Sequence, residues 1–364
     1  MTTPHETPAR TEAPAPRREE APVRRGRVPA PALLLLAVTA LLASVVAATL
    51  FGSADVRPLD VVSTILRHTG LGAFAPTEPL PKLLDALVWE SRFPRVLLAA
   101  AVGTALAVSG AVLQAVTRNP LADPYLLGVS SGASTGAVAV LLLGIGGSVS
   151  LSTGAFAGGL VSFGLLLLLL GGGRVASPSR VVLTGVLVSQ FFAAVTSVIL
   201  MVGGDANSTR GFTYWLLGTL GGARWEGVTV TVVVILAGVA AIQFSAPALD
   251  AFTFGWDAAA ALGIDVTAAR VRLMVLTSVI TAAAVAASGA IGFIGLLVPH
   301  AVRVLAGPTH RSLLPLSAIT GAVFLIWVDV CARTAFSPHE LPAGVITALL
   351  GAPAFALVLK RLES

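Results

Sequence analysis

The sequence predicts an all-α polytopic membrane protein with about ten transmembrane helices. Hydrophobic residues make up 55% of the 364 residues and charged residues 11%, and the mean hydropathy is +0.90. A soluble core with a hydrated surface does not have this composition. Apolar runs of about 20 residues, the length that spans a bilayer, recur with short polar segments between them. Residues 32–361 are therefore expected to form one transmembrane domain.

The first 31 residues differ from all that follow. They are rich in Pro, Ala, Arg and Glu and have no apolar periodicity, which predicts a disordered tail. Six arginines against four glutamates place this tail in the cytoplasm by the positive-inside rule. A cleaved secretory signal is the alternative, but the apolar stretch at 32–51 is longer than such signals have.

The apolar segments alternate in direction across the membrane, and their even number places both chain termini in the cytoplasm. With the tail inside, Arg174 and Arg180 also fall inside, as the positive-inside rule requires. The predicted spans are residues 32–51, 94–116, 124–143, 151–170, 181–202, 228–244, 273–290, 293–306, 313–332 and 342–359. The segments at 53–91 and 203–227 are then outer loops.

A short helix is predicted in the cytoplasmic loop at 245–271. Residues 258–263 read Ala-Ala-Ala-Ala-Leu-Gly, a helix-forming run ended by a glycine, and Arg270 and Arg272 close the loop. We call residues 258–263 the handle, because they offer a compact surface to a partner in the cytoplasm.

An inverted repeat is predicted from two short motifs. Ser109-Gly110-Ala111 precedes Pro120 by the same interval by which Ser288-Gly289-Ala290 precedes Pro299. The copies fall five spans apart and so point in opposite directions, as in many transporters. Chance agreement in a chain this rich in alanine and glycine is the alternative.

The predicted spans contain few ionisable side chains, and this limits the energy sources that a transporter of this kind could use. Asp329 is the clearest ionisable side chain within them, and Arg333 follows at the spacing of a helical ion pair, so a paired structural charge is expected rather than a proton relay. The chain has two lysines, and neither lies in a phosphate-binding loop. A passive channel or a permease powered by a separate subunit remains, and the handle favours the permease. Cys331, in an apolar run, is expected to be a buried thiol.

The segment from Gly289 to Arg303 interrupts an apolar run. Its glycines at 289, 292 and 295 are expected to let neighbouring backbones approach closely, and Pro299 to mark the start or bend of a helix. The segment is interpreted as a tight outer turn followed by a closely packed helix. His300 has no carboxylate or thiol near it in the sequence, so no metal site is predicted.

Several motifs resemble one family, the FecCD-type permeases of iron-siderophore, haem and cobalamin ABC importers. The resemblance covers residues 88–360, leaving out the tail and the 53–88 loop. The motifs that carry it are Arg92-Phe93-Pro94-Arg95, Ser109-Gly110-Ala111 to Gln114, Asn119-Pro120-Leu121-Ala122-Asp123-Pro124, Leu127-Gly128-Val129-Ser130-Ser131-Gly132-Ala133, Tyr214-Trp215-Leu216-Leu217-Gly218, Gly289 through His300, Leu313-Leu314-Pro315, and Glu340-Leu341-Pro342-Ala343-Gly344-Val345 through Gly351-Ala352-Pro353.

The resemblance implies a set of partners. Such permeases act as a pair, formed with a second copy or a close relative, with two ATPase subunits on the cytoplasmic side and a solute-binding protein outside. ATP and Mg belong to the ATPase, so this chain is expected to be no enzyme and to hold no cofactor. Membrane lipid is a further expected partner, and nucleic acid is not.

The resemblance also implies roles for particular residues. Arg92, Arg95 and Arg333 are expected to receive acidic side chains of the binding protein, since arginine holds carboxylates bidentately; the alternatives are anchoring of helix ends and, for Arg333, pairing with Asp329 alone. The handle residues Ala259, Ala260, Ala261, Leu262 and Gly263 match the coupling helix that docks on the ATPase.

The same resemblance implies a cytoplasmic gate. Asn119 and Leu121 match one side of it and Ser179 the other, although Pro178 stands where relatives often carry a small hydroxyl residue. A simple helix cap is the alternative role of Asn119.

The function implied is import of an intact iron-siderophore across the cytoplasmic membrane of a bacterium by alternating access. Cobalamin or haem as cargo, a passive channel and a membrane scaffold are the alternatives.

Overall fold

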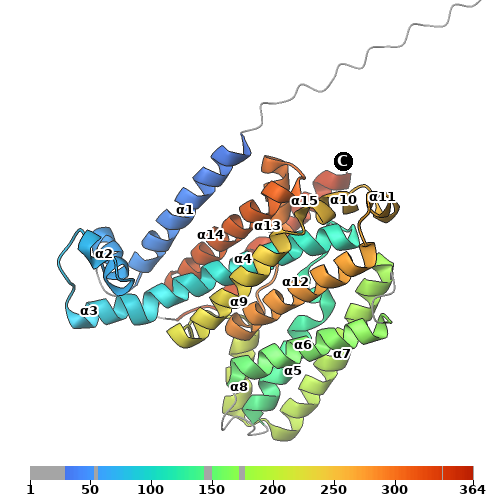
Figure 1. Ribbon diagram of the computed structural model, residues 1–364. Helices are drawn as coiled ribbons and strands as arrows, with labels where there is room; N and C mark the ends of the chain where they lie inside the picture. The colour runs from blue at the N-terminus through green and yellow to red at the C-terminus, as the bar shows by residue number, and fades with distance from the viewer. Residues whose placement is uncertain (1–28, 53–55, 143–149, 172–176, 338, 364) are drawn as a thin grey trace, which may run out of the picture.

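The computed structural model describes residues 29–52, 56–142, 150–171, 177–337 and 339–363, so most of the predicted tail, residues 1–28, lies outside the described residues. The described chain is helical from end to end (Figure 1). The elements are α1 (Ala30–Leu50), α2 (Pro58–His68), η1 (Gly72–Phe74), α3 (Lys82–Ala86), the π-helix η2 (Leu87–Arg92), α4 (Phe93–Thr117), η3 (Pro124–Leu127), α5 (Val129–Leu142), α6 (Leu151–Leu169), α7 (Pro178–Gly203), α8 (Ala206–Leu216), α9 (Trp225–Gln243), α10 (Ala246–Phe252), α11 (Trp256–Ala261), α12 (Val266–Ser288), α13 (Ile294–Ala306), α14 (His310–Thr334) and α15 (Ala343–Glu363).

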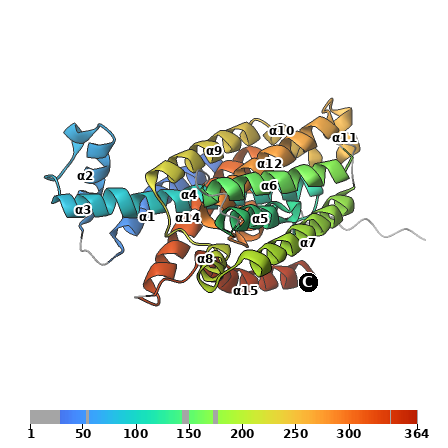
Figure 2. The same cartoon turned by 90° about the horizontal axis from the view of Figure 1, so that it is seen from below.

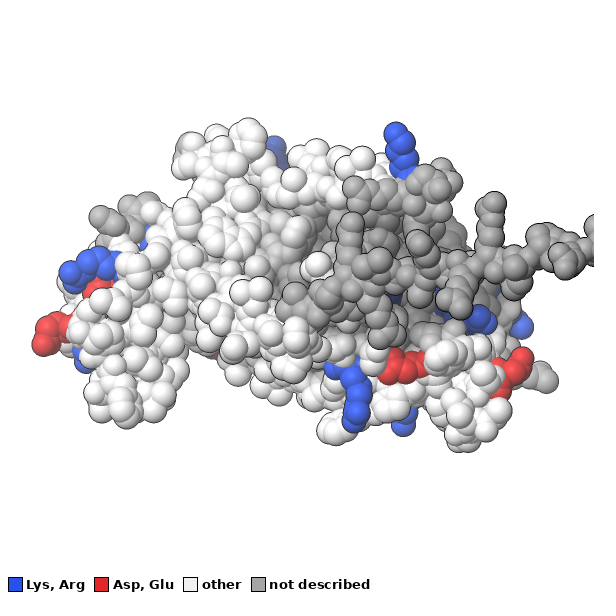
Figure 3. All heavy atoms as spheres, turned by 90° about the horizontal axis from the view of Figure 1, so that it is seen from above, with Lys and Arg blue, Asp and Glu red and all other residues white. Residues whose placement is uncertain are grey.

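The described helices confirm a polytopic membrane protein. Seven of them are long and apolar enough to cross a bilayer, and three shorter apolar helices accompany them: Val129–Leu142, Ile294–Ala306 and Ala343–Leu357. Each predicted span overlaps one of these ten helices. On the face drawn in Figure 3, charged side chains gather mainly toward the two ends of the molecule.

Helix α4 is the centre of the bundle, and nearly all of its residues are buried. It packs against α9, α12, α13 and α14. The packing is close because small residues meet across it: a Cβ added to Gly103 would lie 2.1 Å from the carbonyl oxygen of Gly321 on α14. Membrane helices that lack a hydrophobic drive toward one another associate through such contacts.

The long helices bring the predicted site residues to two opposite ends (Figures 1 and 2). One end has α2 and α3, the start of α4 and the end of α14; we call it the arginine end, after Arg95 and Arg333. The other end has α10, α11 and the turn after α4, and we call it the handle end. Arg118 and Gly255 lie close together there, since the Arg118 guanidinium is 3.9 Å from a Cβ placed on Gly255.

The structure corrects four expectations. The predicted span at 124–143 is broken: η3 ends at Leu127, Gly128 follows with a φ of 76° that favours glycine, and only then does α5 begin. The outer loop at 53–91 contains helices α2 and α3, and the loop at 203–227 contains α8. Cys331 is exposed on α14 rather than buried.

The segment 289–293 is not an outer turn. Its residues are buried or half-buried, and the following helix α13 begins beside the interior of α4, because a Cβ on Gly110 would lie 2.0 Å from the carbonyl oxygen of Gly295. Close backbone approach is confirmed for Gly289 and Gly295, whereas Gly292 has open space beside it.

The two motif copies of the predicted repeat have different local structures. Ser109 and Gly110 lie in the middle of α4, whereas Ser288 ends α12 and Gly289 follows it with a φ of 70°. The motif pair therefore does not support an inverted repeat, which stays a prediction from topology alone.

Candidate functional site

A cluster of charges closes the arginine end of the bundle. The Nε of Arg95 donates to both carboxylate oxygens of Asp329, at 3.0 and 3.1 Å, and its Nη1 donates to Glu340 at 3.0 Å. Exposed fractions of the side chains are 14% for Arg95, 2% for Asp329 and 43% for Glu340. Arg95 thus joins a buried carboxylate to one at the surface. The predicted pairing of Asp329 with Arg333 is confirmed at 3.5 Å, but Arg95 is the nearer partner.

Arg92 and Arg333 hold the end of α1. Arg92 donates to the carbonyl oxygens of Thr49 and Leu50, both at 3.2 Å, and Arg333 donates to that of Ala48 at 2.6 Å. The last four carbonyls of a helix have no partner within it, so these two arginines satisfy three of the four in α1. Helix-end anchoring, the alternative weighed for them, is therefore part of their role.

Three segments that carry sequence motifs meet at one buried point. They are residues 214–218, the start of 289–300, and residues 340–345, which lead into α15. The N–H of Thr219 donates to the carbonyl of Ser288 at 2.7 Å, and the N–H of Gly344 donates to that of Gly218 at 3.3 Å. A Cβ on Gly289 would lie 2.0 Å from the carbonyl oxygen of Trp215. Glycine is needed at position 289 because the backbones of these segments lie so close together that no side chain fits between them.

Gln114 fastens α13 to α4, a role that the sequence did not reveal. Its Nε2 donates to the carbonyl of Gly295 at 3.0 Å, and its Oε1 accepts two bonds from the Arg303 guanidinium, each 3.2 Å long. A buried amide that uses both of its ends in this way fixes two helices in one register.

The predicted gate residues lie at the handle end. Asn119 Oδ1 accepts from the backbone N–H of Leu121 at 2.9 Å, an Asx turn that follows Arg118 in the left-handed region at φ 49°. Leu121 is 42% exposed and Ser179, in the first turn of α7, is also exposed. This bond closes a turn between α4 and η3 rather than capping a helix, so both the gate role and the cap role of Asn119 stay predictions.

Asp123 lies in the same turn, between the spans, with its Oδ1 accepting from the N–H of Tyr125 at 2.9 Å. The Tyr125 hydroxyl in turn bonds both backbone groups of Ile291, accepting at 2.8 Å and donating at 2.9 Å. The turn after α4 is thereby linked to the buried 289–293 segment. Burial raises the pKa of Asp123 to about 6.

Asp123→Asn should change how stability depends on pH. Burial raises the pKa of Asp123 in the folded state, so the folded protein holds this proton more tightly than the unfolded chain does. The stabilisation of the fold by this proton is complete below the ordinary aspartate pKa and is lost as the pH rises through about 6. Between pH 4.5 and 7.5 the wild type should lose on the order of 2 kcal/mol relative to the variant. Thermal unfolding in detergent at both pH values measures this difference, and midpoints that fall in parallel would contradict it.

The handle forms the predicted short helix. Helix α11 runs from Trp256 to Ala261, and Gly263 follows with a φ of 85°. Ala259, within this helix, is fully buried, whereas Leu262, which follows it, is 70% exposed. The Arg270 guanidinium lies 4.1 Å from the ring centre of Trp256 and so fixes the helix against α12.

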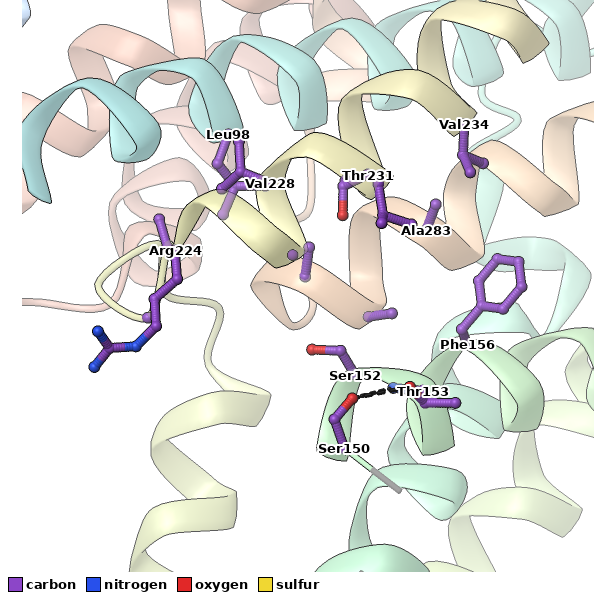
Figure 4. A pocket seen from close by; sticks show the side chains of 16 residues that line it. Leu98, Ser150, Ser152, Thr153, Phe156, Arg224, Val228, Thr231, Val234 and Ala283 are labelled. Atoms are coloured by element: carbon purple, nitrogen blue, oxygen red, sulfur yellow. Dashed lines mark hydrogen bonds between the residues drawn. The ribbon is translucent and has the colours of Figure 1, made fainter. Parts of the chain in front are cut away.

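A cavity of about 310 Å³ opens between α6, α9 and α12, near the arginine end. Figure 4 shows Ser152 and Thr153 on one wall, Val228 and Thr231 on the opposite wall, and Arg224 at the rim pointing away. Its volume is at the lower limit of small-molecule sites. None of the predicted docking, gate or handle residues lines it, so it is a surface recess separate from them.

Comparison with known proteins agrees with this geometry. Residues 40–361 match the model of the FecCD transport family. The match begins before residue 88, so it includes most of α1 and the α2–α3 segment, which the sequence resemblance had left outside.

Named relatives cover most of the chain. The cobalamin import system permease protein BtuC of Halobacterium salinarum is 43% identical over 285 residues, covering 78% of this chain and 76% of the relative. The hemin transport system permease protein HmuU of Yersinia pestis is 40% identical over 283 residues, covering 76% and 84%. A solved structure of a metal-chelate type ABC transporter in an inward-facing conformation is 27% identical, with a TM-score of 0.79 over 91% of this chain and 99% of that one.

Proposed function

Because the chain belongs to the FecCD transport family and is an ABC importer permease, we propose that it carries intact iron-siderophore complexes across the cytoplasmic membrane of a bacterium. It works as one of two permease subunits, with two ATPase subunits below and a solute-binding protein above. The observation that carries this proposal is the handle: an exposed short helix, braced on α12, at the end of the bundle opposite the charge cluster.

The transport step follows from the two ends. ATP binding closes the ATPases and moves the handles, and the cavity between the two permease subunits then opens to one side at a time. Asn119, Leu121 and Ser179 form the cytoplasmic gate in this proposal, supported by the exposure of Leu121 and Ser179 at the handle end, where Asn119 is half-buried. Ala259, Ala260, Ala261, Leu262 and Gly263 form the coupling helix, and Leu262 supplies an apolar knob for a groove on the ATPase.

Cobalamin and haem are the second candidate cargoes. The relatives named for cobalamin and hemin transport support them, at 43% and 40% identity. A chelate of any of these kinds is carried whole, and the apolar helices of this chain offer a weakly polar passage.

Reconstitution tests the proposal. The complete complex, with its ATPase and its binding protein, is placed in liposomes and given a labelled ferric siderophore, cyanocobalamin or haemin. We expect uptake of the ferric siderophore that requires ATP and the binding protein. Equal uptake without ATP would indicate a channel, uptake of another chelate would correct the cargo, and no uptake of any would overturn the transport function.

Docking of the binding protein is proposed at Arg92, Arg95 and Arg333. Arg95 is the most accessible contact, because its partner Glu340 is 43% exposed and an exposed ion pair is worth about 1 kcal/mol or less. An acidic side chain of the binding protein would take the place of Glu340. Arg92 and Arg333 support the site by holding α1 and by adding positive charge.

Glu340→Gln should therefore strengthen docking. Removing the competing carboxylate is expected to lower the Kd of the binding protein about threefold, whereas Arg95→Lys, which keeps the charge but loses the bidentate fork, should raise it about tenfold. Biolayer interferometry on the complex in nanodiscs gives both values. Unchanged affinity in both variants, with unchanged thermal midpoints, would sink the docking proposal.

A further inference from the structure

The first turn of α14 is tied to the segment that carries the handle. Asp250, on α10, accepts the backbone N–H of His310 at 2.7 Å with its Oδ1, and the Nδ1 of His310 lies 2.8 Å from the same oxygen. His310 is buried, whereas Asp250 keeps 31% of its side chain exposed. An ionised carboxylate only accepts, so Nδ1 carries the proton of this contact.

Asp250 replaces a cap that α14 lacks. Thr309 precedes the helix and makes no side-chain cap bond, although the first N–H groups of a helix have no partner within it. Asp250 supplies this bond from another element. A carboxylate at this position also opposes the positive end of the helix dipole.

A second tie meets the next residue of α14. Pro315 lies inside the helix and has no N–H to donate to the carbonyl of Arg311, four residues earlier. Gln243, the last residue of α9, donates to that carbonyl with its Nε2 at 3.2 Å. The segment from 243 to 250 thus holds α14 at two successive residues. Gln243 donates to the carbonyl of Arg311, and Asp250 accepts from the N–H of His310.

This segment leads directly into the handle. Helix α10 is anchored by Leu249 and Phe252, both fully buried, and α11 begins four residues after α10 ends. Helix α14 then runs the length of the bundle: 19 residues separate His310 from Asp329, roughly 28 Å at the rise of an α-helix. Packed helices, first α10 and then α14, therefore connect the handle to the charge cluster at the opposite end.

We propose that Asp250, Gln243 and His310 form a clasp that transmits movement of the handle to α14, so that ATP use and transport stay coupled. This rests on the proposed importer function. Asp250 acts as a positioning residue, because it touches neither nucleotide nor cargo. Without the clasp, the handle would move with the ATPase while α14 stayed behind.

The test compares variants of two helix-capping aspartates, Asp250 and Asp265, in the complete reconstituted complex. Asp250→Ala removes both bonds between Asp250 and His310, whereas Asp250→Asn keeps an Oδ1 that accepts both. Asp265→Ala is the matched control, since Asp265 also caps a helix at this end, accepting from Ala268 at 2.9 Å, but only within its own helix. Gln243→Leu is a milder variant that removes the second tie alone.

The measurement is the amount of labelled chelate transported per ATP hydrolysed, using whichever of the ferric siderophore, cyanocobalamin and haemin the wild type carries. We expect Asp250→Ala to lower this ratio at least tenfold and Gln243→Leu about threefold, with Asp250→Asn and Asp265→Ala within twofold of the wild type. Hydrogen exchange should show an ATP-dependent change in residues 311–316 that Asp250→Ala removes and Asp265→Ala keeps.

The outcomes separate the clasp from the importer function. A wild type without ATP-driven uptake would overturn the importer function. A working wild type with an unchanged ratio in both Asp250→Ala and Gln243→Leu would overturn the clasp alone. If Asp250→Ala does not assemble, the ratio for Gln243→Leu decides: a drop supports the clasp, and no drop rejects it.

Discussion

Arg95→Glu is expected to destroy the folded state of the arginine end. Asp329 is 2% exposed and depends on the Arg95 guanidinium at 2.9 Å. The substitution leaves this buried carboxylate facing another one, and removing one partner of a buried ion pair costs about 3–5 kcal/mol. Since domains are stable by only about 5–15 kcal/mol, little folded protein should be recovered. Size-exclusion chromatography of a fluorescent fusion measures the yield and the thermal midpoint.

Two further variants make this result specific. Arg210→Glu reverses an exposed charge on α8, whose Tyr214 reaches Glu340 at the arginine end, and it should leave the yield unchanged. Arg95→Leu combined with Asp329→Leu removes both charges and should recover part of the folded yield, because replacing a buried pair by apolar groups is often neutral, whereas Arg333 loses its ion pair with Asp329. A monodisperse Arg95→Glu protein with the wild-type midpoint would contradict the structural role of the pair.

The spans were predictable because one property, apolarity over a fixed length, decides them. Every predicted span overlaps an apolar helix. The break before α5 also has visible signals, Asp123-Pro124 and Gly128, although the apolar run around them predicts one unbroken span at 124–143. The 289–293 segment had its glycines as a signal, yet its depth in the bundle depends on α4, and no local pattern gives that.

The charge cluster shows why pairing was only half predictable. Asp329 and Arg333 are four residues apart, a spacing that fixes their distance on any helix. Arg95 is 234 residues from Asp329, and their contact depends on how α4 packs against α14. The same holds for Asp250 with His310 and for Gln114 with Arg303: each polar side chain is visible in the sequence, but its partner, 60 or 189 residues away, is set by the tertiary structure.

Gly110→Ala should strongly destabilise the contact between α4 and α13. The added Cβ would lie 2.0 Å from the carbonyl oxygen of Gly295 and 2.5 Å from its Cα. Both are backbone atoms, so no side chain can move aside, and α13 must separate from α4. That displacement also breaks the bond that Gln114 donates to Gly295 at 3.0 Å. Overpacking of a tight interior costs about 1–3 kcal/mol, and the lost bond to a buried amide adds about 1–3 kcal/mol.

Gly164→Ala is the matched control, because Gly164 lies within a membrane helix, α6, and a Cβ placed there meets nothing within 4 Å. Alanine favours the helix over glycine by about 1 kcal/mol, so this variant should unfold at or slightly above the wild-type temperature, while Gly110→Ala unfolds at least several degrees below it. Equal midpoints for the two variants would mean that α13 can move away from α4 at no cost. In that case the segment 289–293, between α12 and α13, would be a flexible part of the bundle rather than one fixed by its contacts with α4.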